Sequence, residues 1–159
     1  MIFFALSFTM VSFDQMMSLD PHWFSTIFGV YCFAGAFYST LALSSILVIF
    51  LKKKGHLESF VNENHFHDLG KLMFAFSMFW AYIWFSQFLL IWYGNMPEET
   101  VYFNTRMTSD FDWLFYFNLF LNFVVPFFVL LPRGTKRNPA IIKRVAIALL
   151  IGHWLDLYV

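Results

Sequence analysis

The sequence predicts an all-α integral membrane protein, a bundle of about four to five transmembrane helices. Three observations predict this fold class. Of the 159 residues, 60% are hydrophobic and only 13% are charged, and long apolar segments alternate with short polar ones. A soluble domain carries roughly 25% charged residues, so this chain has about half of the polar surface that it would need. Because a chain in lipid has to satisfy its own backbone hydrogen bonds, we expect the apolar segments to be helices.

The apolar segments predict one partial transmembrane domain that covers residues 1–159. Residues 1–13 are too few for a complete crossing, which takes ~20 residues, and give a partial span. Four further spans are predicted at residues 24–51, 72–93, 113–131 and 141–159. Because the first and last segments are cut short without polar flanks, we expect the chain to be a piece of a longer membrane protein or a split copy. We also expect that it does not fold alone.

Charge placement predicts the topology, although the net charge is zero. Residues 52–71 and 132–144 hold nine of the ten basic residues. Residues 14–23 and 94–112 hold only Arg106, together with six of the ten acidic residues. Because cytoplasmic loops are rich in Lys and Arg, we predict the first two segments to be cytoplasmic and the other two periplasmic. The lipid bilayer is therefore the expected partner, and nothing in the charge indicates nucleic acid.

His153 and Asp156 lie within the last predicted span, three residues apart and so on one helix face. Ionisable side chains within a span are costly, and they indicate a proton relay, a ligand site or an ion pair. The alternative is that the helix has already reached the periplasmic surface at these residues. We take both as proton-path candidates.

Residues 62–68 bring two histidines and several polar groups together at the predicted cytoplasmic side. His65, His67 and Asp68 are candidates for the entrance of a proton path. A metal site is the weaker interpretation, because no second pair of ligands follows at zinc-like spacing. A solvated loop explains the pattern equally well.

Residues 14–26 are polar and aromatic at the predicted periplasmic side. Asp20, His22 and Trp23 are candidates for docking a partner domain, and an aromatic anchor at the lipid headgroups is the alternative. Within the third span, Tyr82 and Gln87 are polar groups that could bond a quinone head group or a neighbouring helix.

Two amides and a proline mark the fourth span. Asn118 and Asn122 share a face, which predicts helix–helix hydrogen bonds more readily than a polar path. Pro126 predicts a kink, because it lacks an amide hydrogen.

No cofactor motif is present in the sequence. Cys32 is the only cysteine, so the four thiolates of an iron–sulfur cluster and the CxxCH motif for haem c are both absent. We therefore expect this chain to bind no metal and to hold no redox centre of its own.

Several long motifs resemble one family of membrane proteins. They are residues 18–26, 62–71, 74–93, 97–100 and 153–158, which read SLDPHWFST, NENHFHDLGK, FAFSMFWAYIWFSQFLLIWY, PEET and HWLDLY. They resemble the ActF membrane subunits of bacterial alternative complex III, relatives of the NrfD and polysulfide-reductase membrane proteins. The resemblance extends over essentially the whole chain, although family members are much longer.

The resemblance implies a part of a larger NrfD-like helix bundle in the bacterial inner membrane. The complex is a quinol:cytochrome c oxidoreductase of the respiratory chain, oxidising menaquinol or another quinol. It implies partner subunits that carry iron–sulfur clusters and haems c, and a sister NrfD-like subunit to which the quinol site is usually assigned. For this subunit it implies a structural role or a proton path, without a cofactor of its own. A direct quinone-binding role and a purely structural anchor remain the alternatives.

Overall fold

The fold is helical throughout the part of the chain that the computed structural model describes, residues 2–20, 23–57, 59–108 and 112–158. This confirms the prediction of an all-α protein. Within these ranges, four helical segments are long and apolar enough to cross a membrane: Ile2–Leu19, Phe28–Lys53, Glu63–Gly94 and Asp112–Leu130.

The last predicted span forms helix α7, Pro139–Tyr158, which is 20 residues long. It is not one of the four apolar segments, because Lys143, Arg144 and Asp156 interrupt its apolar sequence. Its start is nevertheless well defined. Pro139 occupies the first helical position, and the side chain of Asn138 accepts a hydrogen bond from the backbone N–H of Ala140 at 3.0 Å.

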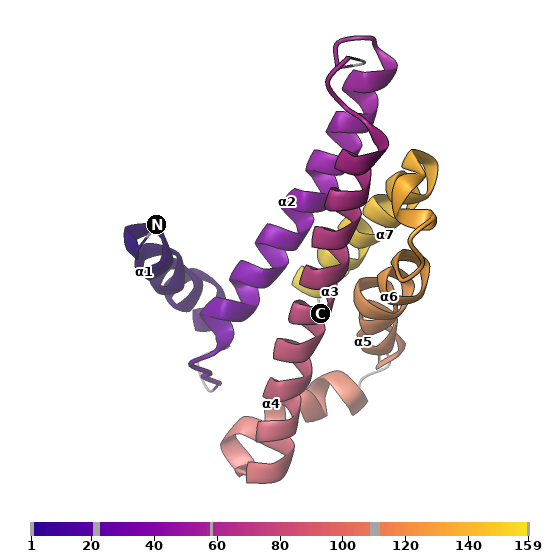
Figure 1. The fold of residues 1–159 in the computed structure, drawn as a ribbon. Coiled ribbons are helices and arrows are strands. Elements are labelled where there is room, and N and C mark those ends of the chain that lie inside the picture. Colours follow the sequence, from indigo (N-terminus) through magenta and orange to yellow (C-terminus); the bar gives the residue numbers. More distant parts are fainter. Residues whose placement is uncertain (1, 21–22, 58, 109–111, 159) are drawn as a thin grey trace.

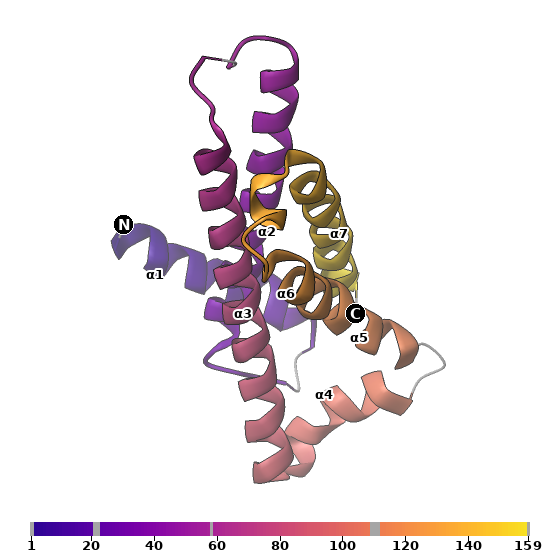
Figure 2. The ribbon, with the colours of Figure 1, turned by 45° about the vertical axis from the view of Figure 1, so that its right-hand side comes forward.

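The first segment is longer than the sequence predicted. Helix α1, Ile2–Val11, continues through a π-helical turn at Ser12–Met16 and a 3₁₀ turn at Met17–Leu19. None of the residues of α1 is buried, and the helix projects away from the bundle beside the lower half of α2 (Figures 1 and 2). Gly29 of α2, Phe28–Lys53, is the point of close approach, since a Cβ there would lie 2.8 Å from the Thr9 side chain.

Helix α3, Glu63–Gly94, begins nine residues before the predicted span. A reciprocal cap explains the early start: the Asn62 side chain accepts from the backbone of His65, and the His65 ring accepts from the Asn62 N–H at 3.2 Å. The helix ends at Asn95, whose φ of 46° is the left-handed conformation that commonly closes helices.

The predicted periplasmic segment 94–112 contains a helix that the sequence analysis missed. Helix α4, Pro97–Thr108, begins with Glu98 and Glu99 in its first turn and carries Arg106 in its last, which suits the helix dipole at both ends. It crosses below the end of α3 and leads into the fourth segment (Figure 1).

The bundle is built around α2, which packs against α3 on one side and α7 on the other (Figures 1 and 2). The fourth segment, made of α5 (Asp112–Leu119) and α6 (Val125–Leu130), packs beside α7. The largest core cluster lies between these helices, toward the end that holds residues 54–62. It consists of Tyr38, Ala42, Ile49, Phe66, Met73, Leu130, Ile142, Val145, Ala146 and Leu149.

Glycine allows α7 to approach the fourth segment closely. A Cβ on Gly152 would lie 2.6 Å from Oδ1 of Asn122 and 3.0 Å from Cβ of Leu121. Both neighbours are held within the packed bundle, so neither can give way cheaply.

We therefore expect Gly152→Ala to destabilise the protein by about 1–3 kcal/mol, the usual cost of overpacking a core. The free energy of unfolding, measured in detergent by denaturant titration, tests this. Gly134→Ala is the control, because a Cβ there meets nothing within 4 Å. Equal stability of the two variants would contradict the close contact.

Candidate functional site

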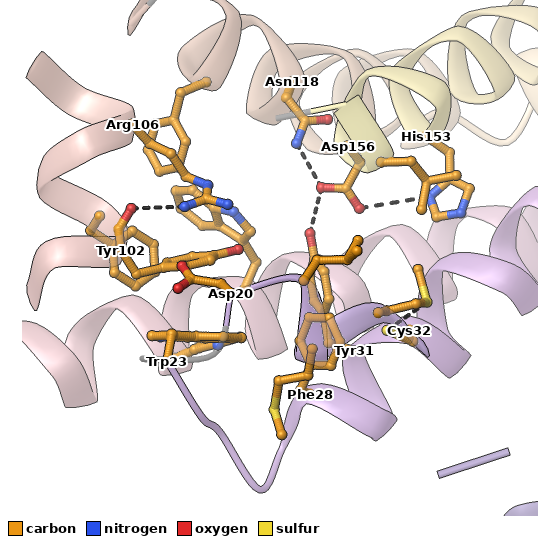
Figure 3. A pocket seen from close by; sticks show the side chains of 18 of the residues that line it. Asp20, Trp23, Phe28, Tyr31, Cys32, Tyr102, Arg106, Asn118, His153 and Asp156 are labelled. Atoms are coloured by element: carbon orange, nitrogen blue, oxygen red, sulfur yellow. Dashed lines mark hydrogen bonds and ion pairs between the residues drawn. The ribbon is translucent and has the colours of Figure 1, made fainter. Parts of the chain in front are cut away.

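A cavity of about 400 Å³ lies between α2, α3, α4, α5 and α7, at the end of the bundle where α4 sits. Its lining is largely aromatic and apolar, but a small polar group converges on one point of the wall (Figure 3). Sites that bind or process small molecules commonly combine an apolar wall with a few convergent polar groups. This cavity is therefore the candidate functional site.

Asp156 is the centre of that polar group. Its side chain is only 5% exposed, and Oδ1 accepts hydrogen bonds from the Tyr31 hydroxyl and from Nδ2 of Asn118, the latter at 2.7 Å. Tyr31 comes from α2 and Asn118 from α5, and the two point at the carboxylate from different sides (Figure 3). A buried carboxylate needs such donors, because burial without them is strongly unfavourable.

His153 faces the second oxygen of the same carboxylate. Its Nδ1 lies 3.7 Å from Oδ2 of Asp156, one turn along α7. The ring is seated on α2, where a Cβ on Gly35 would overlap the ring atom Cε1. Glycine at position 35 therefore makes room for the imidazole, and the ring is held beside the carboxylate.

A series of hydrogen-bonded side-chain amides extends from Asp156 into the bundle. Asn118 donates to Asp156, and Asn122 donates through Nδ2 to Oδ1 of Asn118. Both amides are buried and lie one turn apart on the fourth segment. The predicted helix–helix hydrogen bonding of these two amides is thus seen in part. The Asn118 side chain bonds across to α7, whereas the Asn122 side chain bonds to Asn118 on its own segment.

This series of hydrogen bonds ends at the backbone of Asn122. Pro126 has no amide hydrogen, so the Asn122 carbonyl four residues earlier cannot receive the usual helical bond. The segment widens into a π-helical turn at Phe120–Val124, and the carbonyl accepts instead from the hydroxyls of Ser77 at 2.7 Å and Tyr38 at 3.2 Å. The effect of Pro126 is therefore a π-helical turn. The Asn122 carbonyl that is left free by this turn accepts hydrogen bonds from side chains of α2 and α3.

The other side of the cavity carries a stack of three side chains. The Trp23 ring lies on the Tyr102 ring, with centroids 4.1 Å apart, and the Arg106 guanidinium lies 3.5 Å over the opposite Tyr102 face. Arg106 also donates to the Tyr102 carbonyl oxygen at 2.9 Å. Burial raises the pKa of the Tyr102 phenol, and Arg106 partly opposes this. The phenol is therefore neutral around pH 7.

The docking candidates Asp20 and Trp23, from the first predicted periplasmic segment, have different positions. Asp20 lines the cavity near the stack (Figure 3). Trp23 is only 4% exposed and packs inside the protein, so its side chain gives a partner domain little surface to contact. His22 lies outside the described residues. Docking through this segment stays a prediction.

The two quinone-contact candidates are separated by the structure. Gln87 is 7% exposed and lines the cavity, whereas Tyr82 is 66% exposed on the outer side of α3. Of the two, only Gln87 can reach a molecule in this cavity.

His65, His67 and Asp68 lie at the far end of α3 from the cavity. Thirteen residues separate His67 from Trp80, which lies beside Asp156; this is about 20 Å at the helical rise. His65 caps the helix, and Asp68 pairs with Lys71 at 2.9 Å. The largest apolar core cluster lies between this end and the cavity. The structure therefore does not bring these three residues together with Asp156 and His153.

Several lining residues were not singled out as site candidates from the sequence. Nothing in the sequence indicates Tyr31 as a site residue, because its hydrogen-bond partner Asp156 is 125 positions away. Arg106 is indicated by the sequence, since it is the single basic residue of the predicted periplasmic segments. Among the described residues, no three His, Cys, Asp or Glu side chains gather closely enough to hold a metal ion.

The fold and the cavity define a class: a multi-pass α-helical membrane protein with a buried carboxylate–imidazole pair in a cavity between its helices. The chain matches no protein-family model and none of the curated proteins.

The bonds to the Asn122 carbonyl give a testable prediction. We expect Ser77→Ala to destabilise the protein by about 0.5–1.5 kcal/mol, because the Asn122 carbonyl loses its shorter hydrogen bond but keeps the one from Tyr38. Unfolding in detergent measures the effect. Ser39→Ala is the matched control, since the Ser39 hydroxyl bonds only carbonyls of its own helix, those of Gly35 and Ala36.

Pro126→Ala tests the origin of that cost. Alanine supplies an amide hydrogen to the same turn, so Ser77→Ala should cost less in the Pro126→Ala background than in the natural chain. An equal cost in both backgrounds would show that the Ser77 bond does not compensate for the proline.

Proposed function

We propose that this chain is a membrane subunit of a bacterial respiratory quinol:cytochrome c oxidoreductase of the alternative complex III type. In this proposal Asp156 and His153 take up and release protons within the complex. The observation that carries it is the Asp156 carboxylate, which α7 holds inside the helix bundle, facing a cavity together with the His153 imidazole. Ionisable groups held inside a membrane bundle are typical of proton relays and ligand sites.

The contacts of Asp156 suit a group that changes its protonation state. The Tyr31 hydroxyl and the Asn118 amide donate to one oxygen and so fix the orientation of the carboxylate. The second oxygen faces His153, a group that can accept or return a proton near neutral pH. The pair can therefore hold one proton in two nearby positions, and Asp20 lines the same cavity as a further proton acceptor.

The proposal assigns this chain only one end of a transmembrane path. Between Asp156 and the far end of α3 lies the apolar core around Met73, Leu130 and Leu149, which contains no carboxylate or imidazole among its described members. His65, His67 and Asp68 remain candidates for an entrance at that far end. Their link to Asp156 would need groups supplied by the rest of a larger NrfD-like bundle.

The partners follow from the same proposal. The sequence has no CxxCH motif and only one cysteine, so in this proposal the iron–sulfur clusters and haems c belong to other subunits. The unburied face of α1 and the exposed rings along α3, such as Tyr82 and Trp92, are apolar surfaces for lipid or for the sister NrfD-like subunit. The proposed location is the bacterial inner membrane.

A direct quinol-binding role is the second candidate, and one observation favours it. Gln87, Asp156 and His153 line a single aromatic cavity. An amide, a carboxylate and an imidazole are the groups that could bond the oxygens of a quinol and accept its protons. A purely structural anchor is the remaining alternative, and turnover measurements separate it from both.

Asp156→Asn tests the proton role in the assembled complex. The change keeps the shape of the side chain but removes its ability to ionise, so we expect proton release per electron to fall while the haem content of the complex is unchanged. Proton release from proteoliposomes during quinol oxidation measures this. Unchanged coupling in an assembled, active complex would remove Asp156 from the path. Loss of assembly alone, with normal turnover in what does assemble, would favour the structural anchor.

A second pair of variants on α3 tests the quinol role. If the cavity holds the quinol head group, Gln87→Leu should raise the quinol KM by roughly tenfold, the cost of one lost hydrogen bond in a buried site. Tyr82→Phe is the matched control and should leave KM unchanged, because that hydroxyl faces away from the cavity. Equal KM values for both variants would argue against a quinol at this position.

A further inference from the structure

A groove with three lysines lies at the opposite end of the bundle from the Asp156 cavity. It has a volume of about 500 Å³ and is formed where α2 ends and where α3 and α7 begin. Ile49, Phe66 and Pro139 make an apolar wall, and Lys52, Lys53 and Lys54 supply the cationic part. The proposed respiratory function uses none of these residues.

Two of the ammonium groups are held by the fold. Lys52 Nζ donates to the Val61 carbonyl at 2.8 Å and lies 5.1 Å from the centre of the Phe66 ring. Lys54 Nζ lies 4.6 Å over the Phe50 ring. Such contacts fix the position of a cation while leaving some of its donors available. The groove therefore presents ordered positive charge beside a buried apolar wall.

The positive charge around the groove favours an anion as the ligand. The two segments at this end, residues 52–71 and 132–144, carry nine basic and three acidic residues. The neighbouring face of α2 narrows the choice further, because Leu47 and Phe50 there are 55% and 51% exposed. A free anion gains nothing from these side chains, whereas the upper acyl chain of a phospholipid would cover them. Basic pockets between transmembrane helices on the cytoplasmic side are known to take anionic lipid head groups.

We propose that this groove binds the phosphate of an anionic phospholipid between Lys53 and Lys54, with the upper part of an acyl chain against the exposed side chains of Leu47 and Phe50. The proposal rests on the membrane placement of α2 and α3 and is independent of the respiratory function. A distributed surface charge, as in any positive cytoplasmic face, is the alternative.

The test compares two double variants that remove equal charge. Lys53→Gln with Lys54→Gln removes two of the three groove cations, and Lys71→Gln with Arg133→Gln removes two charges from the same end outside the groove. The protein is purified from membranes with any subunits that accompany it and stripped of loosely held lipid. Phosphatidylglycerol is then titrated in neutral detergent, and native mass spectrometry measures its occupancy, with phosphatidylcholine as the neutral comparison.

We expect each lost groove ammonium to weaken phosphatidylglycerol binding about fivefold, and the control pair to change it less than about twofold. Lys53→Arg with Lys54→Arg should retain binding, which separates loss of charge from loss of fold. Equal weakening by both glutamine pairs would show a distributed charge and overturn the proposal. Equal affinity for phosphatidylcholine would overturn it as well. Displacement of the lipid by excess inorganic phosphate would show a simple anion site instead.

Discussion

A carboxylate placed among apolar helices has to find hydrogen-bond donors, and the arrangement of this bundle depends on how Asp156 finds them. Its donors come from two other helices, Tyr31 on α2 and Asn118 on α5, while His153 on α7 is seated against α2. Asp156 has all of these contacts only when α2, α5 and α7 are all in place. The network thus fixes the relative positions of three helices whose apolar surfaces alone would allow many packings, because lipid chains are as apolar as the helices themselves. The same contacts that position the helices also prepare the carboxylate for chemistry.

The Asn122 carbonyl follows the same rule in the backbone. Pro126 removes one donor, and hydroxyls from α2 and α3 replace it. Because Asn122 also donates to Asn118, which donates to Asp156, the irregular turn and the carboxylate belong to one connected set of bonds. Every donor in the amide part of this set points toward Asp156. Amides hold and orient groups but transfer protons poorly, so this part of the network is better suited to positioning the carboxylate than to conducting protons away from it.

Composition alone was enough to predict the helical membrane fold, because the scarcity of charge leaves few other ways to satisfy the backbone. The limits of the elements were harder to predict. Residues 62–71 look like a loop by polarity, yet Asn62 and His65 form a cap that starts α3 nine residues early. In the site, His153 and Asp156 were found because their spacing is local. Tyr31 was not, because its partner lies in another helix and nothing in a single sequence records that proximity. Trp23 was expected at the membrane surface, but its ring stacks on the Tyr102 ring in the interior.

The two ends of the bundle divide the chemistry between them. In the part of the chain that the structure describes, the hydrogen bonds that connect to Asp156 end at Ser77 and Tyr38, and the apolar core around Met73 and Leu149 lies beyond them. The groups that contact the carboxylate therefore come from its own end of the bundle: Tyr31, Asn118 and His153. Lys52 and Lys54 lie at the other end, beyond the apolar core, and contact Val61, Phe66 and Phe50 there. Arg106, held over Tyr102, is the one lysine or arginine among the described residues that line the cavity together with Asp156.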